Sequence, residues 1–482
     1  MISKESFKKI SEWLWEIPES LASNMKVPAR VYVSERMLKD CFKDKSLEQL
    51  INVASLPGIQ KYALAMPDMH EGYASPIGGV AAIDIKEGII SPGMQGYDIN
   101  CGMKLLKSDY SEKEIKLHLE GLATEIQKEV PSGLGRGRQI KLSLEQIDKI
   151  LEEGIPGLVE KGYGEREDIE NCEAGGCLTW ADASTVSRRA KDRGRDQVGT
   201  LGSGNHFLEI QKVAEILDER VAESFGLFQD QILIMIHTGS RGLGHQVCTD
   251  YIREFIPLML NKYKIKVPDR EFACVPFNSP EGKRALAASA SAANYAWANR
   301  QMIAYFIRKA WERVLGQGTT KLTSLYDVAH NIIKKERYKI NGKETEVVVH
   351  RKGATRAFPP GHPEIPEKYK SVGQPVLIPG SMGTPSYVLV GTQKGEEAFF
   401  STCHGSGRTM SRHAAIKKIS GQEVIRNLKL KGIIVKCQSL RGIAEEAPMA
   451  YKDIDSVVEV VHNAGLSKKV AKLIPLAAIK GE

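Results

Sequence analysis

The sequence predicts an α+β fold: a single large domain over residues 1–482, with a mixed β-sheet core flanked by helices. Residues 283–315 form a long alanine-rich stretch without proline or glycine, which is typical of a helix. Short apolar runs bounded by glycine and proline elsewhere are typical of strands. The two kinds of segment alternate without a regular strand–helix–strand rhythm, and no proline-, glycine- or serine-rich stretch is long enough to separate domains.

The first third of the chain is expected to mix all three kinds of structure. Residues 1–50 are predicted to contain an amphipathic helix and a short strand in ARVYVSERML. Residues 55–107 are rich in glycine, proline and aspartate with short apolar runs, which indicates strands and loops. Residues 111–130 and 143–152 are predicted to be helices.

Strands are expected to dominate the later part of the chain. ILIMIHTGS is predicted to be a buried strand that ends at His237. After the helix at 283–315, strands are expected in TEVVVHRKG, QPVLIPGSM, SYVLVGTQ and EEAFFSTCH. Helical patterning returns at residues 410–425.

Composition is ordinary for a soluble enzyme, with 42% apolar and 26% charged residues. The net charge of +8 is compatible with an anionic partner but does not by itself indicate nucleic acid. The N-terminus lacks an apolar core of signal-peptide length, and no apolar run is long enough to span a membrane. The eight cysteines include no CxxC pair and do not suggest a disulfide framework. We therefore expect a cytoplasmic protein with free thiols and no membrane association.

Five potential metal ligands lie in glycine- or asparagine-rich turns, usually just after an apolar run. They are Asp98 and Cys101 in GYDINCGM, His206 in GSGNHFLEI, His237 in IHTGSRG and His330 in YDVAHNI. A thiolate, a carboxylate and imidazoles together can bind a borderline transition metal, and the ligand types alone favour zinc. Any one of these residues is more often a structural histidine or a small buried cysteine, so the shared pattern carries the prediction.

His404 is the candidate nucleophile. It stands in STCHGSGRTMSRH, where an apolar run opens into a glycine-rich turn that is followed by a helix. Such a turn can hold an anion through backbone N–H groups, and Arg408 adds a guanidinium suited to phosphate. His404 could be a ligand, a general acid or base, or a covalent nucleophile; a structural loop with a solvated histidine is the alternative.

Two further small-residue turns repeat this pattern, HTGSRGLGH with Arg241 and GSMGTPSY. Three such turns in one chain indicate a polyphosphate or a nucleic-acid backbone as ligand. Neither a P-loop nor a dinucleotide-binding fingerprint is present.

Three segments concentrate basic residues: 133–141, 187–195 with Arg188 and Arg189, and 350–356. They could position a phosphate backbone, although basic runs are often only solvated faces. No aromatic residues are interleaved with them, so the sequence does not predict a stacking platform for single-stranded nucleic acid.

Taken together, these segments resemble the RtcB family of RNA-splicing ligases. The resemblance runs from about residue 60 to residue 415 and includes MPDMHEGYASPIGG, GYDINCG, GTLGSGNHFLEI, IHTGSRGLGHQV, AANYAWANRQ, YDVAHN, HRKGATRA, GSMGTPSYVL and CHGSGRTMSR. One small departure is Met94-Gln95, where smaller residues are expected.

The resemblance implies two Mn²⁺ ions per chain and GTP as cofactor. Asp98, Cys101, His206, His237 and His330 would hold the metals, with Cys101 bridging, and His404 would be the guanylylated nucleophile. If residues 205–209 form a strand, Asn205 and Glu209 share one face and His206 points to the other. The residues implied for guanylate binding are Asn205, Glu209, His330, Asn331, Ser381, Met382, Ser386, His404, Gly405, Ser406, Gly407, Tyr451 and Lys480. Those implied for RNA binding are Arg188, Arg189, Arg241 and Arg408.

The activity implied is GTP-dependent joining of an RNA 3′-phosphate or 2′,3′-cyclic phosphate to a 5′-hydroxyl through a histidine–GMP intermediate. It would serve tRNA splicing, with tRNA exon halves as substrates, and RNA repair, with archease as the activating partner. A metallophosphoesterase would use the same metals and turns without GTP. A non-catalytic RNA-binding protein would need only the basic segments.

Overall fold

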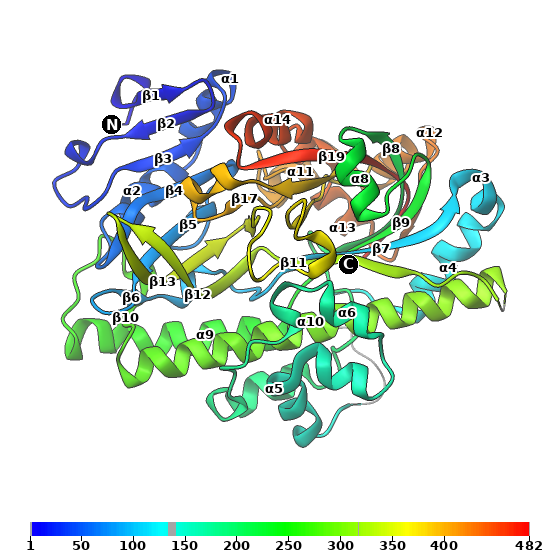
Figure 1. Ribbon diagram of the computed structural model, residues 1–482, viewed down its shortest axis with the longest axis horizontal. Helices are drawn as coiled ribbons and strands as arrows, with labels where there is room; N and C mark the ends of the chain where they lie inside the picture. Colours follow the sequence, from blue (N-terminus) through cyan, green and yellow to red (C-terminus); the bar gives the residue numbers. More distant parts are fainter. Residues whose placement is uncertain (1, 134–140, 317, 482) are drawn as a thin grey trace.

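The computed structural model describes residues 2–133, 141–316 and 318–481. Two large, mostly antiparallel sheets and a layer of helices make up the fold (Figure 1), which confirms the α+β prediction. One sheet has the order β1 (Lys8–Ser11), β2 (Leu14–Ile17), β3 (Ala29–Tyr32), β4 (Ile59–His70), β5 (Ile77–Asp84), β13 (Lys343–Lys352) and β12 (Asn331–Ile340).

Most of the candidate site residues lie on or next to strands of the second sheet. Its order is β11 (Thr323–Ala329), β7 (Gly102–Ser111), β9 (Gln231–Thr238), β8 (Phe207–Ile216), β19 (Ser467–Lys480), β16 (Ser386–Gly391) and β15 (Pro375–Ile378), with β18 (Ile434–Cys437) parallel to β19. Two small ribbons pair β6 (Ile89–Ile90) with β10 (Val275–Pro276) and β14 (Ala354–Arg356) with β17 (Ser401–Cys403).

The long helix α10 (Pro280–Leu315) runs beneath the sheets together with α9 (Arg241–Pro257), as Figure 1 shows. Its first turn has proline at the first position and the Ser279 hydroxyl accepting the Gly282 N–H, and it ends before Gly316. The other helices are α1 (Glu35–Leu38), α2 (Ser46–Ala54), α3 (Glu112–Ile115), α4 (Leu119–Glu129), α5 (Leu144–Glu160), α6 (Arg166–Glu170), α7 (Arg188–Gly194), α8 (Glu219–Phe225), α11 (Arg412–Lys418), α12 (Gly421–Leu430), α13 (Leu440–Glu445) and α14 (Ile454–Ala464).

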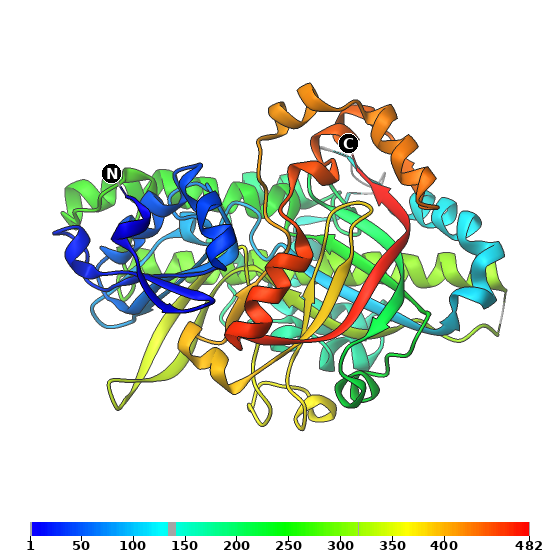
Figure 2. The ribbon, with the colours of Figure 1, turned by 90° about the horizontal axis from the view of Figure 1, so that it is seen from above.

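The amphipathic helix expected within residues 1–50 does not precede the strand β3; α1 and the start of α2 follow that strand. Residues 8–17 form the β1–β2 hairpin, which lies at one end of the molecule (Figure 2), and β2 pairs in turn with β3. Trp15 and Ile17 are buried, and their aromatic and β-branched side chains suit a pleated surface. The strand predicted in ARVYVSERML is present as β3.

The strand predicted in EEAFFSTCH is shorter than expected. Residues 393–398 form a 3₁₀ turn, and Phe399 and Phe400 have positive φ angles of 51° and 45°. Only Ser401–Cys403 is extended, because the two phenylalanines turn the chain before the strand can begin. The other predicted strands and helices are present with shifted ends; the helix expected at 111–130, for example, is broken into α3 and α4.

Within the described residues, no helix is both long and apolar enough to cross a membrane.

Candidate active site

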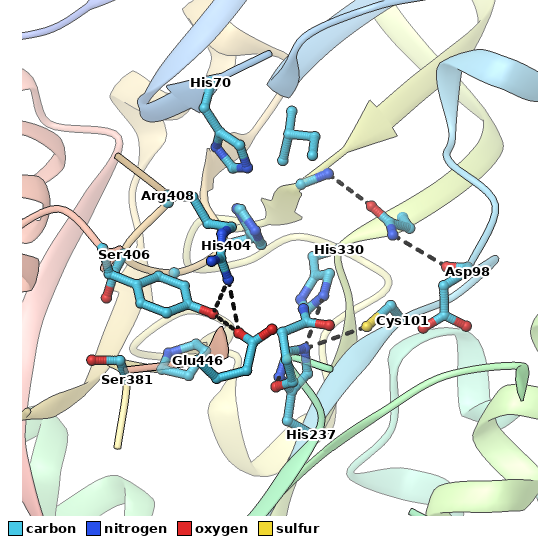
Figure 3. Close-up of a pocket in the computed structure, with 18 of the residues that line it drawn as sticks. His70, Asp98, Cys101, His237, His330, Ser381, His404, Ser406, Arg408 and Glu446 are labelled. Carbon is cyan, nitrogen blue, oxygen red and sulfur yellow. Dashed lines mark hydrogen bonds and ion pairs between the residues drawn. The ribbon is translucent and has the colours of Figure 1, made fainter. Parts of the chain in front are cut away.

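A pocket of about 350 Å³ is lined by residues of both large sheets and by the turn that carries His404 (Figure 3). Strand register brings the candidate metal ligands to one wall of it. β7 pairs with β9 and β11, and β9 pairs with β8, so that Met103 faces His237, Gly102 faces Ala329, and Phe207 faces His237. The turns that precede β7, β8 and β12 therefore lie next to each other although they are far apart in sequence.

The five candidate ligands converge because these strand pairings bring their turns together. Cys101 Sγ lies 3.3 Å from His237 Nε2 and 3.5 Å from His206 Nε2. His206 Nε2 lies 2.8 Å from Asp98 Oδ2, and His237 Nε2 lies 3.4 Å from His330 Nε2. The ligand atoms fall into two groups that share Cys101: Cys101 with His237 and His330, and Asp98 with Cys101 and His206.

The helix α10 holds two of these turns in place. Asn299 accepts the N–H groups of Gly199 and Thr200 and donates to the Gly239 carbonyl. Arg300 is fully buried and donates to the carbonyls of Asn100 and Thr238. These contacts explain the polar residues in the AANYAWANRQ segment of a buried helix, because they satisfy backbone groups that the ligand turns leave open.

His237 and His330 are poised as neutral ligands. His237 Nδ1 lies 3.0 Å from the Asn205 carbonyl, so it carries the proton and leaves Nε2 as an acceptor that faces the cluster. Burial lowers the pKa of both His237 and His330 well below the usual histidine value. Burial would raise the pKa of Asp98, but the neighbouring His206 outweighs it and lowers that pKa to about 2.

This donor set fits metal ions better than it fits a closed protein core. Burial raises the pKa of the Cys101 thiol well above its usual range, and the Asp98 charge raises it further. The thiolate form is therefore unfavourable unless a cation is bound. His330 Nδ1 has no hydrogen-bond partner among the described residues. One thiol, one carboxylate and three imidazoles in two groups with a shared sulfur can hold two borderline divalent ions.

His404 lies directly after β17, in the turn that borders the pocket. Its Nδ1 lies 2.5 Å from Asp68 Oδ2, and the same oxygen accepts the backbone N–H of His404 at 2.9 Å. Asp68 is a carboxylate acceptor, so His404 Nδ1 carries the proton and Nε2 has a free lone pair. Burial would raise the pKa of Asp68, but the adjacent His404 holds it below its usual value.

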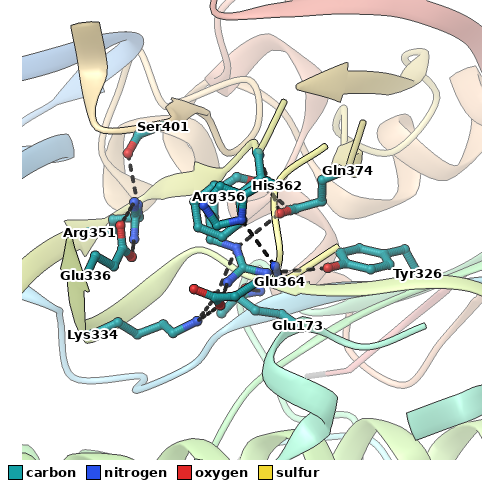
Figure 4. Close-up of polar contacts among 12 residues, drawn as sticks. Glu173, Tyr326, Lys334, Glu336, Arg351, Arg356, His362, Glu364, Gln374 and Ser401 are labelled. Carbon is teal, nitrogen blue, oxygen red and sulfur yellow. Dashed lines mark hydrogen bonds and ion pairs between the residues drawn. The ribbon is translucent and has the colours of Figure 1, made fainter. Parts of the chain in front are cut away.

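A buried polar network supports the strand that carries His404 (Figure 4). Arg351 of β13 donates to the Ser401 hydroxyl at 2.9 Å and to the Phe399 carbonyl at 2.7 Å, and it is paired with Glu336. Arg356 of β14 donates to Glu364 at 2.7 Å. Arg351 thus ties β13 to the left-handed turn at Phe399 and to β17, the strand that directly precedes His404, and β14 pairs with β17 along its length.

The opposite side of the pocket offers polar groups for a nucleotide. Its wall includes Ser381, Met382, Ser406, Tyr451 and Lys480. Lys480 Nζ donates to the Gly204 carbonyl at 2.7 Å. Burial lowers the pKa of Lys480, partly offset by the carboxylates of Glu446 and Glu209.

Glu209 and Ser386 lie behind this wall and do not line the pocket. Gln211 joins them by donating to Glu209 at 2.7 Å and to the Ser386 hydroxyl at 3.0 Å. Burial raises the pKa of Glu209 to about 7, and its second oxygen has no hydrogen-bond partner among the described residues. This leaves a buried carboxylate oxygen without a donor in the described part of the chain, separated from the cavity by the pocket wall.

The expectation that residues 205–209 form one strand is wrong. β8 begins at Phe207, and Asn205 and His206 belong to the preceding turn. The alternation of faces therefore does not reach them. His206 is directed to Asp98 by the turn, and Asn205 lines the pocket.

Comparison with known proteins identifies the family of this chain. A family model described as tRNA-splicing ligase RtcB matches residues 49–481. The chain belongs to the RtcB family. It is 52% identical to tRNA-splicing ligase RtcB of Archaeoglobus fulgidus, with 98% of each chain covered. It is 49% identical to the Thermococcus kodakarensis protein of the same name, again with 98% of each covered. The RNA-splicing ligase RtcB of Mycobacterium tuberculosis is 49% identical over 90% of this chain and all of its own.

The arginines of this RtcB family member are placed unequally. Arg188 and Arg189 lie on the exposed side of α7, outside the pocket lining, where Arg188 pairs with Asp192 at 3.0 Å. Arg241 donates to Thr200 and to the Gly133 carbonyl, and Arg408 donates to Glu446 at 2.9 Å and to the Glu445 carbonyl. The last two guanidinium groups are thus largely engaged by protein acceptors, so their geometry favours a structural role at the pocket wall over direct RNA contact. Most of the basic segment 133–141, at residues 134–140, lies outside the described residues.

Several residues in or next to the pocket were not predicted from the sequence. Asp68 and His70 follow an apolar run in MPDMHEG, which was a usable signal because both belong to the end of a strand. Glu446 and Arg412 come from α-helical surroundings with no local pattern. They were missed because only the tertiary fold brings them to the His404 turn.

Proposed function

We propose that this chain is a GTP- and Mn²⁺-dependent RNA ligase that joins RNA 3′-phosphate or 2′,3′-cyclic phosphate ends to 5′-hydroxyl ends. The observation that carries the proposal is the position of His404. Its Nδ1 is held by Asp68, and its ring lies 5.1 Å from the ring of His330, one of the candidate ligands. A histidine with a free Nε2 beside a two-metal donor set suits nucleophilic attack on a phosphate. The relatives named as splicing ligases supply the substrate class.

Two Mn²⁺ ions would be held by Asp98, Cys101, His206, His237 and His330, with Cys101 shared between them. Bound there, they would neutralise charge that develops on the phosphate oxygens. The shared sulfur follows from the two donor groups, which have only Cys101 in common.

The first chemical step falls to His404. Its Nε2 attacks the α-phosphorus of GTP, a P–N bond forms, and pyrophosphate leaves. Asp68 keeps the proton on Nδ1 and stabilises the charge on the ring as the bond forms. Gly407 shapes this turn: its φ is 68°, and an added Cβ would lie 2.2 Å from the Asp68 carbonyl oxygen.

The later steps use the histidine–GMP intermediate to activate RNA. A 3′-phosphate oxygen attacks the phosphorus of GMP, and the P–N bond to His404 breaks. The 5′-hydroxyl oxygen then attacks the RNA phosphorus, its proton is lost, and GMP leaves. A 2′,3′-cyclic phosphate would be hydrolysed first. The mixed anhydride turns a poor leaving group into a good one, which is the reason for consuming GTP.

The guanylate would lie against Asn205, Ser381, Met382, Ser406 and Tyr451, with Glu209 and Lys480 reading the base. Lys480 would donate to the guanine O6, and Glu209 would accept from the guanine N1–H and amino group once the wall in front of it opens to the base. Ser386 would act through the Gln211 contact that it shares with Glu209. The remaining residues assigned to the nucleotide are His330, Asn331, Gly405 and Gly407.

We further propose that the protein acts in the cytoplasm on tRNA exon halves and in RNA repair, with archease as activator. Arg188 and Arg189 would hold the RNA backbone. RNA is supported by the names of the relatives, and the other assignments rest on the family resemblance.

Incubation with Mn²⁺ and GTP radiolabelled at the α-phosphate tests the proposal. We expect label that stays on the denatured protein and is released by acid, as a histidine phosphoramidate is. A metallophosphoesterase would bind the metals and cleave phosphate esters without becoming labelled, and an RNA-binding protein would do neither. Absence of acid-labile label with the metals bound would exclude the ligase mechanism.

Lys480→Met should reduce the preference for GTP over ATP. Loss of a charged hydrogen bond to guanine O6 costs roughly 1.5–3 kcal/mol, so discrimination between GTP and ATP should fall about 10- to 100-fold. The rate of self-labelling at a series of GTP and ATP concentrations measures this. Lys468→Met is the matched control, because Lys468 lies on the same strand and is exposed. Unchanged nucleotide preference in Lys480→Met would remove Lys480 from base recognition.

A further inference from the structure

Beyond His404, the pocket continues into an aromatic arm that the proposed chemistry does not use. Figure 3 shows His70 on the other side of His404 from Ser381. Tyr73, which follows His70 closely in sequence, and Tyr97, which directly precedes Asp98, also line the pocket. The guanylate residues Tyr451 and Lys480 belong to the other wall, so this arm is left for a second ligand.

Three aromatic side chains from separate segments meet here; we call Tyr73, Tyr97 and His245 the aromatic arm. Tyr97 and His245 are stacked with ring centroids 5.0 Å apart and an angle of 29°. Tyr73 meets Tyr97 edge to face at 5.4 Å. His245 is exposed and both tyrosines are half-buried, so the group runs from the pocket to the surface.

The arm is held in shape by the surrounding protein. Lys352 is buried and donates to the carbonyls of Tyr73 and Ser75. The Glu271 carboxylate accepts the N–H of Ala74, the residue after Tyr73, at 2.9 Å. A rigid, preorganised aromatic surface binds a planar ligand at low entropic cost.

Positive charge continues from the outer end of the arm. His245 lies on α9, and Arg193 of α7 donates to its neighbour Gln246 at 3.0 Å. Arg188 and Arg189 begin the same short helix. An aromatic surface next to arginines matches single-stranded nucleic acid, in which bases stack and phosphates meet the cations.

We infer that the aromatic arm stacks the unpaired terminal base of an RNA end and thereby sets that end beside His404. The inference rests on the proposed RNA ligase function, since it assigns RNA to the part of the same pocket that guanylate does not use. The sequence does not predict a stacking platform, because no aromatic residues are interleaved with the basic segments; the arm is instead assembled from residues 73, 97 and 245, which are distant in sequence.

RNA oligonucleotides with 2-aminopurine as the terminal base test the inference, because stacking quenches their fluorescence. One strand ends in a 3′-phosphate and the other begins with a 5′-hydroxyl. The full-length chain should quench one or both on binding, and an oligonucleotide with an abasic terminal position should bind about 5- to 100-fold more weakly. Quenching of only one strand identifies which RNA end uses the arm, and either result supports the inference.

Variants of His245 test whether the quenching and the tighter binding come from the aromatic arm. His245→Ala should weaken binding of the intact strand roughly fivefold or more and reduce the quenching, whereas His245→Phe should restore both. His118→Ala, which changes another exposed histidine, is the control. Thermal unfolding of each variant reports whether it is folded.

Equal affinity for intact and abasic strands, or no quenching of either strand, would overturn the inference. Because this measurement needs neither GTP nor joining, that result would leave the self-labelling of His404 untouched. Failure of self-labelling would instead overturn the proposed function.

Discussion

His404→Ala is expected to abolish the covalent GMP adduct, reducing label from α-radiolabelled GTP by on the order of 10³-fold or more. The nucleophile itself is removed, so no slower route through the same atom remains. Metal content, measured by elemental analysis, should be unchanged because the candidate ligands are other residues. Given RNA that already carries a 3′-guanylylated end, the variant should still join it to a 5′-hydroxyl.

This pair of results separates a nucleophile from other roles. If His404 were a ligand or a general base, the adduct would shrink but persist, and joining of the activated RNA would fail as well. His413→Ala is the control, since His413 is exposed on α11. A GMP adduct on another residue of the His404→Ala protein would contradict the mechanism.

Cys101→Ala is expected to remove both metals and to lower self-labelling by more than about 100-fold. Cys101 is the one residue common to the two donor groups, so a single substitution weakens both. Elemental analysis and the labelling assay measure the two effects. Cys172→Ala, equally buried but outside these groups, should retain metals and activity. Two ions still bound to Cys101→Ala would rule out a shared sulfur.

Metal binding to the unaltered chain should strengthen as pH rises. Burial and the Asp98 charge raise the pKa of the Cys101 thiol, so binding must displace its proton. For each proton released, the apparent Kd falls by about tenfold per pH unit below that pKa. The Cys172→Ala protein should show the same slope.

Much of the architecture could be predicted because its signals are local. The alanine-rich run predicts α10, and glycine-flanked turns after apolar runs pick out all five candidate ligands, which the structure brings together. The N-terminal hairpin was missed because the burial of Trp15 and Ile17 against neighbouring strands overrides a pattern that suits a helix.

Other features depend on contacts between distant segments and leave no local pattern. Asp68 is separated from His404 by 336 residues. The aromatic arm draws on three segments, and the start of β8 at Phe207 is set by pairing with β9 and β19. Sequence periodicity cannot report such contacts, since it describes one element at a time.

The shared donor set also has a consequence for folding. The residues that flank Cys101 in the cluster, His206 and His237, are separated from it by 105 and 136 positions. Metal ions held by the two donor groups that share Cys101 would cross-link these segments and close very long loops. In the chain-entropy account, a disulfide that closes a loop of about 100 residues stabilises a protein by roughly 4.7 kcal/mol, through the freedom it removes from the unfolded chain. The metal centre would then stabilise the second sheet as well as take part in the reaction. Removing the metals with a chelator would destabilise the strands next to the ligand turns.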